Sequence, residues 1–208
     1  MESLKKILVA LDLSDFDREV LNYVKKLADI IGAKEIHCIH VLKKDLVPKQ
    51  LEEQYSAQIE SLEAQIKHDA NQIVNHAFEG VQDQTIYTKV LKGTPFEQMI
   101  KYSHDHSIDL IAVGQKIQSE SSGIVPHRLS QKAHCSILIV PEASEPDFKR
   151  IFLPVDFSDY SDKALNFVQL INEKAPLEAV CIQNIYKIPL PSYKAMRGTS
   201  TIHQKRKA

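Results

Sequence analysis

Two short acidic segments with the same spacing contain the first residues that could do chemistry. Asp12 and Ser14 follow one apolar run directly, and Asp156 and Ser158 follow another. A carboxylate and a hydroxyl at such a point can contact a ligand, or they can close a turn and cap a helix. Ser14 and Ser158 are expected to cap helices, with Asp17 as the capping-box acid after Ser14. For Asp12, turn residue and ligand contact are both open interpretations.

The histidines and cysteines do not predict a metal centre or a catalytic group. His37 and His40 are three residues apart in an apolar segment, so on a strand they point to opposite faces. His127 and His134 are seven apart and would share a helix face, but no acid or thiol partner accompanies them, and zinc needs three or four ligands. No metal site and no enzymatic activity are therefore expected.

Apolar runs and helical periodicity alternate over the first two thirds of the chain. Strands are expected at residues 6–11, 35–42, 85–91, 109–113 and 136–141. Helices are expected between Ser14 and Gly32, over 49–78, from Pro95 to about His104, and near 124–133. This alternation predicts a parallel sheet covered by helices on both faces. Ligands of such sheets bind beyond the carboxyl ends of the strands.

The segment 5–43 recurs as 149–187 without gaps. A repeat of this length corresponds to a domain rather than to a solenoid unit. We therefore expect a complete domain over residues 1–142, a linker over 143–148, and a partial second domain of strand, helix, strand and tail over 149–208. A half domain exposes a sheet edge and an apolar face. It is expected either to be a truncated product or to pack against the first domain or another subunit.

The bulk composition excludes several classes of protein. Hydrophobic residues make up 43% of the chain and charged residues 25%, and the formal net charge is −1. These values are ordinary for a globular protein and give no sign of nucleic-acid or membrane binding. No apolar run is long enough to span a membrane, and the first run ends at Asp12, too early for a signal peptide. Three widely separated cysteines favour a reducing compartment, so a cytoplasmic location is expected.

Four of these segments, taken in order, resemble the universal stress protein family. They are Asp12 at the end of the first strand, VLK at 41–43, DLIAVG at 109–114 and CSILIVP at 135–141. The resemblance covers 5–141 as a whole domain and 149 to about 193 as the start of a second. It implies a doubly wound, flavodoxin-like or adenine-nucleotide-hydrolase-like sheet in the order 3-2-1-4-5, plus a partial second copy. Family members are usually dimers, and tandem members pair chiefly through their fifth strands.

The resemblance also implies where a nucleotide would lie. Asp12 matches the family's first-strand acid near the nucleotide, and Val41 matches the position that contacts adenine through its backbone. ATP-binding members carry G-x-x-G, then nine residues, then G-S/T after the fourth strand. Gly114 matches the first glycine and Gly123 the last, but Ile117 replaces the second glycine and the loop is shorter.

This loop is therefore degenerate as a phosphate site. A β-branched residue at position 117 does not readily adopt positive φ, and Ile124 replaces the hydroxyl residue. Ser122 and Gly123, in the segment QSESSG, lead into a helix and could rebuild an anion site with other spacing.

The leading hypothesis is a non-enzymatic stress-response or regulatory protein with weak or no adenine-nucleotide binding and no firm cofactor. One alternative is an ATP-binding, slowly hydrolysing protein that uses the QSESSG loop. Another is a structural dimerisation module for an unknown protein partner. A homodimer through residues 136–141 is expected, because the second copy lacks its own fifth strand.

Overall fold

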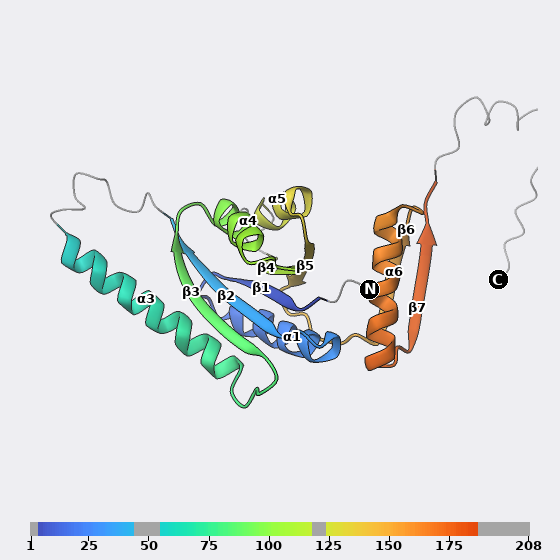
Figure 1. Cartoon of the computed structure of the whole chain (residues 1–208), viewed down its shortest axis with the longest axis horizontal. Helices are drawn as coiled ribbons and strands as arrows, with labels where there is room; N and C mark the ends of the chain where they lie inside the picture. Colours follow the sequence, from blue (N-terminus) through green and yellow to red (C-terminus); the bar gives the residue numbers. More distant parts are fainter. Residues whose placement is uncertain (1–3, 44–54, 118–123, 187–208) are drawn as a thin grey trace, which may run out of the picture. The chain divides into compact units, whose positions relative to one another are not determined.

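The computed structural model describes residues 4–43, 55–117 and 124–186. The chain divides into two compact units, Met1–Asp147 and Phe148–Ala208 (Figure 1). In the described residues, no helix is both long enough and apolar enough to cross a membrane.

Unit 1, residues 1–147, contains one five-stranded parallel sheet. Its strands are β1 (Lys6–Leu11), β2 (Glu35–Leu42), β3 (Thr85–Lys92), β4 (Leu110–Gln115) and β5 (Ser136–Pro141). They lie in the order β3-β2-β1-β4-β5, which confirms the predicted doubly wound topology. The helices are α1 (Phe16–Ile31), α3 (Ser56–Ala77), α4 (Pro95–Asp105) and α5 (Ile124–Lys132). Helices α1 and α3 cover one face of the sheet, and α4 and α5 cover the other (Figure 1).

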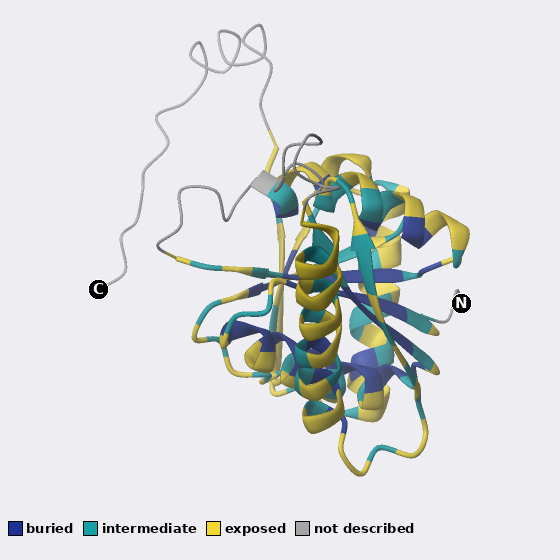
Figure 2. Cartoon of the chain, turned by 90° about the vertical axis from the view of Figure 1, so that its left-hand side faces the viewer, coloured by how far each residue is buried: buried dark blue, intermediate teal, exposed yellow. Residues whose placement is uncertain are grey.

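The core of unit 1 lies on both faces of the central strand. Ile7, Leu8 and Val9 of β1 are completely buried, as expected for a strand with helices on either side. Helix α1 buries one apolar face, whereas α3 buries only Ala70 and Val74 and is otherwise largely exposed (Figure 2). Only part of the predicted apolar stripe of α3 is thus buried. Residues 49–54 of the predicted helix lie outside the described residues.

The helix ends confirm some of the predicted caps and correct others. Gly32 ends α1 in the left-handed conformation, with φ of 71°, as predicted. The prediction that Ser14 caps α1 is wrong, since Asp15 occupies the cap position and the Ser14 hydroxyl bonds to Asp12 instead. Ser158 does cap its helix, because its Oγ accepts from the N–H of Ser161. His134 lies beyond the end of α5, so the helix face predicted for it does not exist.

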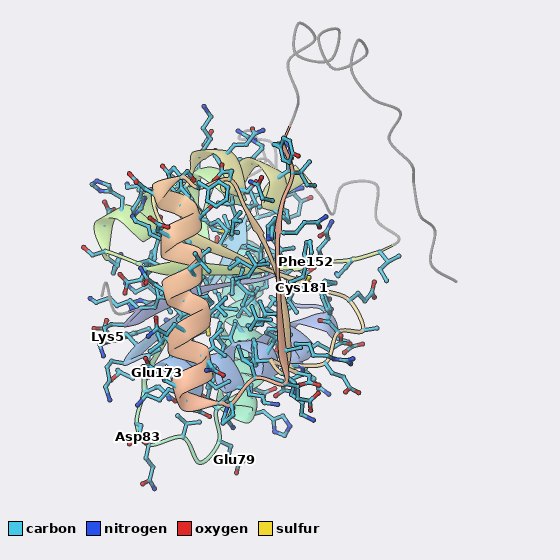
Figure 3. All side chains as sticks on the ribbon, turned by 90° about the vertical axis from the view of Figure 1, so that its right-hand side faces the viewer. Lys5, Glu79, Asp83, Phe152, Glu173 and Cys181 are labelled. Carbon is cyan, nitrogen blue, oxygen red and sulfur yellow. The ribbon has the colours of Figure 1, made fainter. Side chains whose placement is uncertain are left out.

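Unit 2, residues 148–208, contains β6 (Arg150–Val155), α6 (Asp159–Lys174) and β7 (Ala179–Asn184). The two strands are parallel, as the repeat predicts. Phe152 is 59% exposed and lies beside Cys181, its partner residue on β7 (Figure 3). The position equivalent to Phe152 in unit 1 is Leu8, which is completely buried. In unit 1 further strands flank this β-α-β core, whereas among the described residues β6 and β7 pair only with each other.

Candidate functional site

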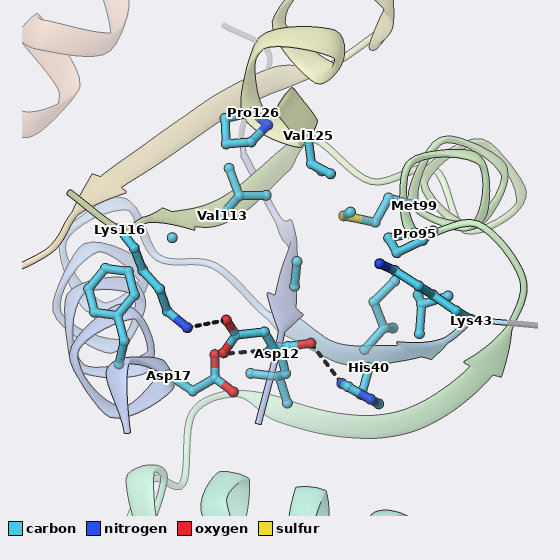
Figure 4. A pocket seen from close by; sticks show the side chains of 16 residues that line it. Asp12, Asp17, His40, Lys43, Pro95, Met99, Val113, Lys116, Val125 and Pro126 are labelled. Atoms are coloured by element: carbon cyan, nitrogen blue, oxygen red, sulfur yellow. Dashed lines mark hydrogen bonds and ion pairs between the residues drawn. The ribbon is translucent and has the colours of Figure 1, made fainter. Parts of the chain in front are cut away.

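A cavity of about 430 Å³ opens at the carboxyl ends of β1, β2 and β4 in unit 1 (Figure 4). This is the position at which parallel α/β sheets bind ligands. Its apolar part is formed by Ile39, Val41, Met99, Val113 and Val125, and its polar part by Asp12, His40, Lys43 and Lys116. The volume lies within the usual range for a small-molecule site.

Asp12 forms a tight turn at the end of β1. Its Oδ1 accepts from the backbone N–H of Ser14 at 3.0 Å and from the Ser14 hydroxyl at 2.5 Å. Between them, Leu13 adopts a left-handed φ of 61°. The same turn recurs in unit 2, where Asp156 accepts from the N–H and hydroxyl of Ser158. Because the turn forms in both units, Asp12 is a structural turn residue as well as part of the cavity wall.

Lys116 binds the other oxygen of the same carboxylate. Its Nζ lies 2.6 Å from Asp12 Oδ2, although the two residues are 104 positions apart in the chain. Burial works against ionisation of Asp12, but the bonds from Lys116 and Ser14 outweigh it and hold its pKa below the usual value. Asp12 is therefore an ionised, well-bonded carboxylate at the cavity wall.

Asp17 lies behind this turn and is almost fully buried. Its carboxylate accepts the backbone N–H groups of Asp12 at 3.2 Å and of Leu13 at 2.7 Å. Burial raises its pKa to about 6, despite these two bonds, and the nearby negative charge of Asp12 acts in the same direction. The capping-box pattern placed an acid here, but it did not indicate that the acid is buried and supports the first turn.

Gly114 lies against α1 at the end of β4. A Cβ atom at this position would lie 2.5 Å from Cε1 of Phe16, closer than packed atoms approach. Gly114 also lines the cavity. Its glycine identity is thus explained by close packing of strand and helix.

The fold and the cavity can be compared with known proteins. The model of the family described as "Universal stress protein family" matches residues 3–141, about two thirds of the chain. The chain belongs to the universal stress protein family. No curated protein matches it.

Solved universal stress proteins share the fold. The protein UspA from Lactobacillus plantarum is 18% identical, with a TM-score of 0.58 over 67% of this chain and 99% of that one. A universal stress protein from Archaeoglobus fulgidus DSM 4304 is 19% identical, with a TM-score of 0.64 over 94% of this chain and 72% of that one. At these identities the likeness shows the fold. The second match also extends beyond unit 1, which ends at residue 147 of 208.

Ile117 is the residue that the sequence resemblance predicts to replace the second glycine of a phosphate loop. Its side chain is 75% exposed, and its backbone N–H donates to the carboxylate Oε2 of Glu142 at 3.0 Å. This backbone donor is therefore already bonded to a protein carboxylate. Ser122 and Gly123 lie outside the described residues.

The other predicted site residues fall at the cavity, together with residues that sequence patterns did not indicate. Asp12, Val41 and Gly114 all line it. Lys43 and Lys116 were not singled out as cavity cations, although each lies one position beyond a strand end at which ligand contacts were expected. In the described part of the chain, no group of three or more histidine, cysteine or acidic residues could hold a metal ion.

Proposed function

We propose that this universal stress protein is a non-enzymatic regulatory protein whose unit 1 binds an adenine nucleotide weakly. The apolar cavity offers space for a base next to Val41, the position that the family resemblance links to adenine. The acids nearest the cavity have structural partners: Asp12 is bound by Ser14 and Lys116, and Asp17 by backbone N–H groups. This arrangement favours binding over catalysis.

The observation that carries the proposal is the hydrogen bond from the Ile117 N–H to Glu142. Because of this bond, the Ile117 N–H faces a carboxylate and is not available to a phosphate group. A polyphosphate approaching this loop would lose that donor and meet like charge, so affinity for ATP is lowered.

Isothermal titration calorimetry of the full chain with magnesium ATP tests this function. We expect a dissociation constant of about 1 mM, an affinity of about 4 kcal/mol. Val125→Trp, which fills the cavity from α5, is expected to remove binding, while Leu62→Trp on the exposed part of α3 is the matched control. Absence of heat at millimolar ATP would refute nucleotide binding. Micromolar affinity would instead favour the ATP-hydrolysing alternative.

Glu142→Ala tests the hydrogen bond to Ile117 directly. Removal of this carboxylate releases the Ile117 N–H and a negative charge, so ATP is expected to bind more tightly. Glu145→Ala removes a nearby charge without that bond and serves as control. Equal effects of the two substitutions would count against a role for the Ile117 N–H in weakening ATP binding.

We further propose that unit 2 is the first part of a second universal stress domain. The repeated turn at Asp156 and the parallel β6-α6-β7 arrangement support this assignment. We also propose a homodimer through β5, since among the described residues β5 pairs only with β4. Light scattering at micromolar concentration tests the dimer, and a monomer mass would contradict it. The free cysteines support a cytoplasmic location, which fractionation of cells tests.

A second candidate function is a docking module for a protein partner. The apolar side chains of unit 2 favour it, since Phe152, Phe157 and Ile182 are each more than half exposed. Affinity capture with the full chain and with Phe152→Ser, followed by identification of bound proteins, separates this candidate from nucleotide binding. Equal capture by the two chains would count against it.

A further inference from the structure

The ion pair between Lys116 and Asp12 sits at the wall of the nucleotide cavity. Both side chains line the cavity, and the Lys116 ammonium group points to the neighbouring carboxylate on the same side of it (Figure 4). The side chains are 33% and 57% exposed, respectively. An ion pair with this exposure contributes little to stability, so it can be exchanged at small cost.

The turn at Asp12 does not need a lysine. In unit 2 the bonds to the side chain of Asp156 come from Ser158 and Ser161, and the turn has the same form, with φ of 62° at Phe157. The lysine contact is thus an addition that unit 1 makes at its cavity. It is a property of the binding site rather than of the fold.

An anionic ligand would compete with Asp12 for this lysine. A phosphate group offers several oxygens and a larger charge than a carboxylate, and its bonds to an ammonium group are charge-assisted. In the free protein, however, the Asp12 carboxylate occupies Lys116 and repels an approaching phosphate. Lys43 lines the opposite side of the cavity and adds positive charge there (Figure 4).

We infer that Lys116 is the specificity-determining cation of this cavity, that Asp12 is its internal competitor, and that the site selects a nucleoside monophosphate over the neutral nucleoside. The inference rests on the proposed function and adds to it the residue that recognises the phosphate group of the ligand. It reverses the expected effect of a substitution at Asp12. A carboxylate that contacts the ligand would be needed for affinity, whereas a competitor lowers it.

Calorimetry of the full chain with AMP and with adenosine tests the inference. Asp12→Asn keeps an oxygen that can accept from Ser14, and it is expected to raise the ratio of AMP affinity to adenosine affinity about fivefold. Lys116→Gln is expected to abolish the preference for AMP over adenosine, and Lys116→Arg to keep it. Lys101→Gln, on the exposed face of α4, makes the same charge change away from the cavity and should leave both affinities unaltered.

The outcomes separate the two proposals. Suppose that the wild-type chain binds both adenosine and AMP. If Asp12→Asn then binds AMP more weakly, or if Lys116→Gln still prefers AMP over adenosine, the competitor inference is overturned. The proposed nucleotide function is not affected by either result. Failure of the wild-type chain and all variants to bind either compound overturns both. Thermal melts of each variant show whether a lost affinity reflects lost folding. If Asp12→Asn unfolds, the comparison of Lys116→Gln with Lys116→Arg still tests the inference.

Discussion

Gly114 packs so closely against Phe16 that a Cβ atom added to the glycine would lie 2.5 Å from Cε1 of the phenylalanine ring. The contact joins the end of β4 to the first residue of α1, at the cavity wall. It gives the glycine a packing role that is independent of any ligand.

Gly114→Ala is therefore expected to lower the free energy of unfolding by about 1–3 kcal/mol, the usual cost of overpacking. Phe16→Leu creates room at the same place, so the alanine substitution should cost less in that background. Chemical denaturation of the single and double variants measures this coupling. Equal costs of Gly114→Ala in both backgrounds would show that Phe16 is not the cause.

The buried carboxyl group of Asp17 predicts a pH dependence of stability. Its pKa is about 6 in the folded chain and 3.8 ordinarily, so the native state binds the proton more tightly. The corresponding stability is present below pH 3.8 and is lost as pH rises through 6, by about 3 kcal/mol. Asp17→Ser should lack this fall, because a serine hydroxyl does not ionise in this pH range. Serine should also keep the bond to the turn, since Ser161 at the repeated position accepts from the Asp156 N–H at 2.9 Å.

Denaturant unfolding at pH 4 and pH 7 checks this prediction. The stability of Asp17→Ser relative to wild type should increase between the two values. Asp83→Ser, at an exposed position, is the control and should show no such change. A constant difference between Asp17→Ser and wild type would mean that Asp17 is already ionised at pH 4.

His37 predicts a pH dependence of opposite sign. It is buried, and its Nδ1 lies 3.0 Å from the Tyr102 hydroxyl while Nε2 lies 3.2 Å from the Glu35 carboxylate. Burial lowers its pKa and outweighs the raising effect of Glu35, with His106 and Lys6 adding repulsion. The native state thus favours neutral His37. Its contribution to stability is present above pH 6.5 and is lost as pH falls through the lowered pKa.

His37→Gln should accordingly flatten the loss of stability below pH 6.5. At pH 7.5 it should cost about 1 kcal/mol, the typical value of a hydrogen bond such as that to Tyr102. His104→Gln is the control, since the His104 side chain is 82% exposed. Thermal melts from pH 5 to pH 8 measure both variants. Parallel pH profiles of His37→Gln and wild type would contradict the prediction.

Cysteine accessibility predicts one fast thiol. Cys181 is exposed, whereas Cys38 is fully buried with a raised pKa and Cys135 is half-buried with its pKa raised to about 11, in both cases chiefly by burial. Ellman's reagent at pH 8 should label Cys181 at least about tenfold faster than the others. Cys181→Ser should lose the fast phase. A fast phase that persists in this variant would show that unit 1 opens readily.

The local elements of this protein could be predicted from sequence because they depend on short-range patterns. Apolar runs such as 6–11 and 136–141 indicated strands, and Gly32 marked the end of α1. The repeated segment indicated a second strand, helix and strand, which β6, α6 and β7 confirm. Strand order came from the family resemblance, since periodicity alone does not order strands.

The tertiary structure decided which distant side chains meet. Lys116 reaches Asp12 across 104 residues because the neighbouring parallel strands β1 and β4 end side by side. His37 of β2 meets Tyr102 across 65 residues because α4 packs on that face of the sheet. The same packing buried Asp17 and placed Phe16 against Gly114, neither of which a pattern of residue types could show. The sequence by itself determined the elements and the edge of the sheet where a ligand is expected to bind. Only the fold decided the charges, bonds and close contacts there, because these depend on distances between residues far apart in the chain.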